Sequence, residues 1–133
     1  MKQIAFLLAI IALLPACTQN NGNIGPLFGR WQLLEIALPD SSINPEGTLY
    51  LSFQNEVVLF QRLADDGHST HTYFGTFVHT ADSLLTNLSH DDHTVLSYFH
   101  ITDTTTPAFA VKQLDRKRLI LAAGDTTWIY RKY

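Results

Sequence analysis

Short segments of alternating apolar and polar residues follow one another from residue 28 to the end of the sequence. They are rich in Val, Ile, Thr, Tyr, Phe and Leu, which is typical of β-strands, and clusters of Pro, Gly, Asn, Asp and Ser separate them. A further short element, a strand or a helical turn, is expected within 95–101. The pattern predicts strands at 28–37, 48–53, 56–63, 70–79, 83–88, 109–115, 118–123 and 126–132.

The alternation also predicts which side chains face inward. Leu49, Leu51 and Phe53 share one face of their strand, because successive side chains point to opposite sides. The segment 56–63 is apolar on both faces. The simplest explanation is a strand that is buried on both sides; the alternative is that a loop or a partner covers one face. Eight short strands with short turns are typical of a closed barrel, which has no open sheet edge. We therefore expect an all-β fold, an antiparallel eight-stranded up-and-down barrel.

The first residues have the pattern of an export signal. Lys2 precedes the apolar run 4–14, which is shorter than the roughly 20 residues of a membrane span and fits a secretory signal peptide. The sequence that follows, Leu14-Pro15-Ala16-Cys17, resembles the lipobox of bacterial lipoproteins, although Pro15 departs from its commonest middle residues. The resemblance implies cleavage before Cys17 and thioether lipidation of its sulfur, with palmitate among the acyl chains of the anchor. The bilayer would then be a partner through the lipidated Cys17.

Cysteine usage agrees with this interpretation. The chain has a single cysteine, so no internal disulfide forms, and lipidation explains an otherwise free exported thiol; the alternative is a plain signal peptide cut elsewhere. Several acyl chains anchor a protein stably without spanning the membrane. Thr18 is not the Asp associated with inner-membrane retention, so we expect the outer membrane, facing the periplasm. The expected organisation is a signal peptide at 1–16, the lipidated Cys and a flexible polar tether at 17–26, and the barrel at 27–133.

Composition excludes two classes of protein. The chain is 46% hydrophobic and only 16% charged, which argues against disorder. Twelve acidic residues outnumber nine basic ones, and no basic stripe appears, so we expect no nucleic-acid partner.

Two short motifs give a family resemblance. Phe28-Gly29-Arg30-Trp31 resembles the Gly-x-Trp signature that opens lipocalins, and Arg131 stands where such barrels place a basic residue over that tryptophan. Phe74-Gly75-Thr76-Phe77 resembles a step in the small lipocalin-like lipoproteins of Bacteroidetes-type bacteria. The resemblance implies a lipocalin-like barrel over 27–133 whose end is closed by Gly29, Trp31 and Arg131, as structural residues. It also implies a small apolar or amphipathic ligand in the barrel.

Candidate chemistry is sparse. His90 and His93 flank two aspartates and are weak candidates for a metal site, but a polar loop is the simpler interpretation. His68 and His71 would point to opposite faces of a strand and so cannot chelate one ion. The pairs 65–66 and 91–92 are acidic but lie in turn-like clusters, and no Gly-x-Ser-x-Gly motif is present. We expect no enzyme, no cofactor and no metal.

Two functions remain open from the sequence. In one, a pocket at the end opposite Trp31 binds the ligand, lined by apolar strand faces and the loop 39–47. In the other, the many large side chains fill the barrel, and a non-enzymatic module engages an envelope protein through its surface. The long stretch 89–107 is the expected rim or contact surface. The sequence identifies neither the ligand nor the protein partner.

Overall fold

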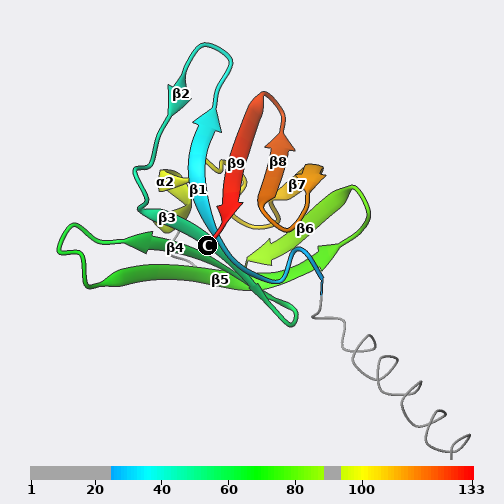
Figure 1. Ribbon diagram of the computed structural model, residues 1–133, viewed down its shortest axis with the longest axis horizontal. Helices are drawn as coiled ribbons and strands as arrows, with labels where there is room; N and C mark the ends of the chain where they lie inside the picture. The colour runs from blue at the N-terminus through cyan, green and yellow to red at the C-terminus, as the bar shows by residue number, and fades with distance from the viewer. Residues whose placement is uncertain (1–24, 89–93) are drawn as a thin grey trace, which may run out of the picture.

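The computed structural model describes residues 25–88 and 94–133, which form one curved sheet and a short helix (Figure 1). The elements are β1 (Gly29–Ala37), β2 (Ser42–Ile43), β3 (Leu49–Gln54), β4 (Val57–Leu63), β5 (Thr70–His79), β6 (Ser83–Leu88), α2 (Thr94–Tyr98), β7 (Ala108–Leu114), β8 (Arg118–Ala123) and β9 (Thr126–Lys132).

The sheet closes on itself. Its order is β2-β1-β3-β4-β5-β6-β7-β8-β9, all pairs are antiparallel, and β1 also pairs with β9, so eight strands form a barrel and the two-residue β2 is a spur on β1. This confirms the predicted eight-stranded antiparallel barrel. The short element expected within 95–101 is the helix α2. All strands and buried side chains among the described residues lie within 27–132.

Large side chains fill the barrel. Trp31, Phe53, Phe60, Phe99 and Tyr130 each expose 1% of their surface or less, and the inward positions predicted on β3 are buried. Burial raises the pKa of the Tyr130 hydroxyl above its ordinary value, because the charged form would lose its hydration. The interior of the barrel is therefore a packed core.

The helix α2 covers one end of the barrel, called the helix end below. Leu96 and Phe99 are fully buried there, and the Phe99 ring meets Phe60 edge to face at 5.3 Å between centroids. The indole Nε1 of Trp128 donates a buried hydrogen bond of 2.6 Å to the Phe99 carbonyl oxygen. The turns 64–69 and 124–125 lie at the same end.

The opposite end, called the entry end below, is where the described chain begins. The start of β1 and the end of β9 lie side by side there (Figure 1), together with the turns 55–56, 80–82 and 115–117. Trp31 is fully buried, and its Nε1 donates a hydrogen bond of 3.0 Å to the Leu27 carbonyl oxygen. Gly29 has a φ of +114°, and a Cβ there would lie 2.9 Å from the Lys132 Nζ atom. Gly29 therefore permits a close approach of Lys132.

The expectation that Arg131 covers Trp31 is wrong by one residue. The Nζ atom of Lys132 lies 4.5 Å from the Trp31 ring, whereas the exposed Arg131 donates from Nε to the Gln32 Oε1 atom at 2.6 Å. The register explains the difference, because Trp31 is opposite Lys132 and Gln32 is opposite Arg131, and directly opposed residues share a face. Burial lowers the pKa of the Lys132 ammonium from its ordinary value.

The outer face of β4 is not buried, contrary to the simplest interpretation of its apolar sequence. Val57 is 37% exposed, and Phe74, Val78 and Leu85 on the neighbouring β5 and β6 are exposed to a similar or greater degree. These four residues form an apolar stripe on the outside of the barrel. Within 25–88 and 94–133, no helix is long and apolar enough to cross a bilayer.

Candidate functional site: a groove at the helix end

An open groove of about 530 Å³ lies at the helix end, between α2 and the adjoining parts of β4 and β5. It is at the end opposite Trp31, as expected, but β4, β5 and α2 line it and the loop 39–47 does not. That loop instead contributes Ile43 and Pro45 to a second hollow beside α2. The residues that line the groove are Arg62, Thr70, His71, Thr72, Tyr73, Phe74, Thr94, Val95 and Tyr98.

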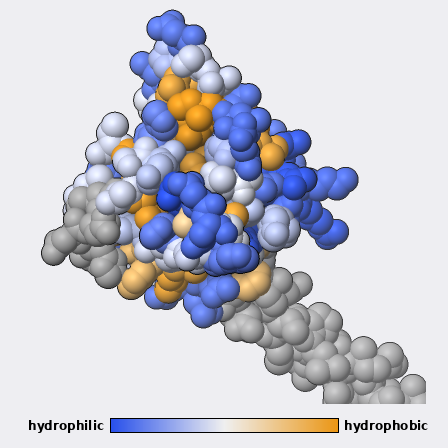
Figure 2. Space-filling view, turned by 90° about the vertical axis from the view of Figure 1, so that its left-hand side faces the viewer, coloured by the Kyte–Doolittle hydropathy of each residue, from blue (hydrophilic) through white to orange (hydrophobic). Residues whose placement is uncertain are grey.

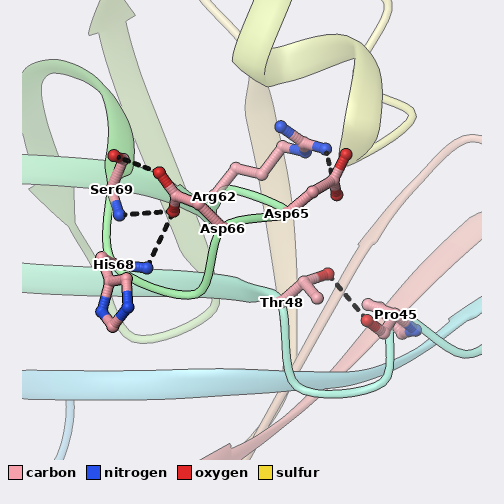
Figure 3. Close-up of polar contacts among 7 residues, drawn as sticks. All are labelled: Pro45, Thr48, Arg62, Asp65, Asp66, His68 and Ser69. Carbon is pink, nitrogen blue, oxygen red and sulfur yellow. Dashed lines mark hydrogen bonds and ion pairs between the residues drawn. The ribbon is translucent and has the colours of Figure 1, made fainter.

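Arg62 supplies the positive charge of the groove. Its guanidinium carbon lies 4.1 Å from the centre of the Tyr98 ring, a cation–π distance, and its Nη2 atom is 3.5 Å from the Asp65 Oδ1 atom (Figure 3). His71 lies opposite Arg62 in the β4–β5 register and therefore on the same face. The guanidinium is thus held in place by an aromatic ring and by an exposed carboxylate.

Apolar and polar groups share the lining of the groove. Tyr73 and Val95 are buried at 3% and 8% exposure, and the Tyr98 ring flanks them. Thr70 and Thr72 add hydroxyl groups at the rim. The side of the molecule on which the β4–β5 turn projects accordingly shows hydrophilic and hydrophobic areas next to one another (Figure 2). A cation in a groove that is also lined by aromatic and aliphatic side chains suits a molecule with an apolar body and an anionic head group.

The two aspartates beside the groove are turn residues, as the sequence indicated for this pair. The Asp66 carboxylate accepts hydrogen bonds of 2.8 Å from the backbone N–H groups of Ser69 and His68 and one of 2.7 Å from the Ser69 hydroxyl (Figure 3). These donors, the Ser69 N–H first, lower the pKa of Asp66 to about 2. The group is therefore ionised at neutral pH and is not a proton donor there.

The lowered pKa predicts how the turn 64–69 responds to acid. Because the pKa falls from 3.8 to about 2 on folding, the contribution of Asp66 to stability is complete above pH 3.8 and is lost as the pH falls through 2. The carbon-13 shift of the side-chain carboxyl in an NMR titration should give a midpoint near 2. The Asp66→Asn variant identifies the resonance by its disappearance. A midpoint at 3.8 would contradict the hydrogen-bonded turn.

The other candidate residues are not brought to the groove. Gly29, Trp31 and Arg131 lie at the entry end, and Cys17, His90 and His93 lie outside the described residues. Among the residues that the structure describes, no three His, Cys, Asp or Glu side chains gather as a metal site would require. Arg62 and Tyr98 were not among the residues predicted from the sequence. The signal was present in Arg62, the one basic residue of a strand that is otherwise uncharged.

Comparison with known proteins identifies the fold. A family model described as the lipocalin-like domain matches residues 11–133. The chain is similar to a lipocalin-like protein from Bacteroides uniformis, with a TM-score of 0.72 and 26% identity over 82% of this chain and 100% of that one. It also has the fold of an uncharacterized protein from Bacteroides eggerthii, with a TM-score of 0.70 and 23% identity over 80% of this chain and 99% of that one. No curated protein matches. The chain belongs to the lipocalin-like domain family.

Proposed function

We propose that this protein is a membrane-anchored, non-enzymatic binding module of the outer membrane that holds a small amphipathic acid in the groove at the helix end. The lipocalin-like barrel is a fold of the ligand-binding or binding-module kind. The observation that carries the proposal is that the Arg62 guanidinium, held against the Tyr98 ring, shares the groove with the buried side chains of Tyr73 and Val95. The anchor is the lipid on Cys17, with the barrel facing the periplasm.

The packing of the barrel determines where the ligand binds. The described interior is filled by buried aromatic and aliphatic side chains, so the ligand lies at the mouth of the barrel and not in its centre. The groove volume, about 530 Å³, is within the range of about 300–1,000 Å³ typical of small-molecule sites. The apolar part of the ligand would cover Val95 and Tyr73.

The head group of the ligand would replace Asp65. The Asp65 side chain is fully exposed, and exposed ion pairs contribute little to stability. A ligand carboxylate that reaches Arg62 from within the groove loses more water than Asp65 does and forms a stronger, charge-assisted hydrogen bond. The cation–π contact with Tyr98 keeps the guanidinium in the same position in both states.

Titration calorimetry of residues 18–133 tests this proposal. Octanoate, 1-octanol and octylammonium share one apolar chain and differ in the charge of the head group, and octanoate should bind most tightly. Arg62→Gln should weaken octanoate binding about tenfold or more and leave octanol nearly unchanged, because only the charged hydrogen bond is lost. Arg116→Gln, which removes the same charge at the entry end, is the matched control and should change neither.

The outcome separates two functions. An equal loss of octanoate affinity in Arg62→Gln and Arg116→Gln would contradict a carboxylate site at Arg62. Equal affinities of the unchanged protein for the three probes would contradict it as well. If none of the probes binds, the second candidate is favoured: a filled barrel that engages an envelope protein through the apolar stripe of Val57, Phe74, Val78 and Leu85.

A further inference from the structure

Basic residues that are scattered in the sequence gather at the entry end of the barrel. They come from the start of β1, the β7–β8 turn and the end of β9, which the closure of the barrel places next to one another. Arg116, Lys117 and Arg131 are exposed. This group, called the basic end below, consists of Arg30, Arg116, Lys117, Arg118, Arg131 and Lys132.

Three acidic residues at this end balance only part of the six positive charges. Asp115 lies within the group, and its carboxylate is held ionised by hydrogen bonds from the backbone N–H groups of Lys117 and Arg118. Glu56 and Asp82 lie on the β3–β4 and β5–β6 turns. At the helix end the loops and turns carry the opposite charge, through Asp40, Glu46, Asp65, Asp66, Asp103 and Asp125. The barrel is therefore positive at one end and negative at the other.

The chain also enters the barrel at the basic end. The Lys132 ammonium donates to the carbonyl oxygens of Pro26 and Phe28, which fixes the entering segment against β9. The eight Cα–Cα steps from Cys17 to Gly25 span at most about 29 Å when fully extended. A lipid on Cys17 would therefore hold the basic end, and not the acidic end, close to the bilayer.

Two further features at this end suit a lipid surface. Phe28 and Tyr133 are 46% and 66% exposed, and exposed aromatic rings are favoured at the level of the head groups. A hollow of about 570 Å³ is lined by Gly25, Pro26, Asp115, Arg116 and Lys132, so two cations and one carboxylate line it.

We propose that the basic end docks on the anionic head groups of the bilayer, so that the barrel stands with its groove directed away from the membrane. The proposal rests on the lipid anchor of the proposed function and adds an orientation to it. Clusters of Lys and Arg next to a membrane anchor are attracted to anionic lipids within about one Debye length. The acidic helix end is repelled by the same surface, so both ends favour the same orientation.

The test uses the full chain, lipidated in a bacterial host and reconstituted into vesicles. Because Cys17 carries the lipid, a cysteine introduced by Ala81→Cys at the entry end or by Thr102→Cys at the helix end is the single free thiol and takes one fluorophore. Quenching by a quencher-labelled lipid reports how close each end lies to the bilayer. Vesicles with about 30% phosphatidylglycerol are compared with pure phosphatidylcholine at low and high salt.

The variants isolate the role of the basic end. On anionic vesicles the label at residue 81 should be quenched more than on phosphatidylcholine, and high salt should remove the difference. The double variant Arg116→Gln with Lys117→Gln should lower the ratio of docked to undocked anchored protein by on the order of tenfold or more. Ser41→Glu with Thr106→Glu changes the net charge equally but at the helix end, and should leave the docked state intact.

Three results would overturn the docking. The first is a chain that floats with both kinds of vesicle and whose label at residue 81 is quenched equally on both. Such a chain is anchored by its lipid but does not dock through the basic end. Equal effects of the two double variants would show a response to net charge only. The third is a chain whose mass shows no lipid and that floats with neither kind of vesicle. Its Cys17 would be a free thiol, so it would take up two fluorophores. This result would overturn both the anchor and the docking.

Discussion

Replacing Trp31 with alanine is expected to destabilise the barrel by about 3–5 kcal/mol, the usual range for a buried Trp→Ala change. The side chain is fully buried, and its Nε1 donates to the Leu27 carbonyl oxygen at 3.0 Å. Lys132 covers the ring at 4.5 Å. Truncation would leave a cavity at the entry end, an unpaired buried carbonyl and an ammonium without its aromatic partner, so three losses combine.

Circular dichroism melts of residues 18–133 measure this effect. A loss of this size lowers Tm by on the order of 10–20 °C in a domain of about 100 residues. Phe28→Ala is the control, because Phe28 is an aromatic residue of the same segment that is 46% exposed and should cost far less. A Tm equal to that of the unchanged domain in Trp31→Ala would show that the indole does not plug the barrel.

The fold was predictable from the sequence because strand alternation is a local property. The shared face of Leu49, Leu51 and Phe53 on β3 follows from a period of two. The two-residue β2 is too short to leave such a pattern. The position of the helix α2 was expected, but its type was left open, because five residues carry too little periodicity to separate a helix from a strand.

The contacts between strands were not predictable in the same way, because they depend on register. A shift of one residue exchanges the two faces of a strand, which is why Lys132 and not Arg131 covers Trp31. The groove has the same origin, since Arg62 on β4 meets Tyr98 on α2 only after the barrel has closed. The basic end is likewise assembled from three segments whose charges look dispersed in the sequence.

Replacing Gly75 with alanine is expected to destabilise the barrel by at least about 2–3 kcal/mol, at the upper end of the usual cost of overpacking. A Cβ at this position would lie 2.2 Å from the Asn87 carbonyl oxygen and 2.6 Å from the Leu88 Cδ2 atom. Real Cβ atoms do not approach other atoms within 3.0 Å, and the first of these atoms belongs to the backbone, so β5 and β6 would have to separate. Their pairing between Gly75 and Leu88 would be strained.

The sign of this change is what makes it informative. Where the native backbone permits it, Gly→Ala usually stabilises a protein by about 0.4–1 kcal/mol, because alanine restricts the unfolded chain. The φ of Gly75 is not in the left-handed region, so a loss of stability would come from the contact with Asn87 and not from the backbone conformation.

Gly25→Ala is the matched control. A Cβ there meets nothing within 4 Å, so this change should alter the free energy of unfolding by less than about 0.5 kcal/mol. Urea unfolding of both variants gives the comparison. Equal stabilities would show that β5 and β6 do not approach each other as closely as the Phe-Gly-Thr-Phe step of β5 requires.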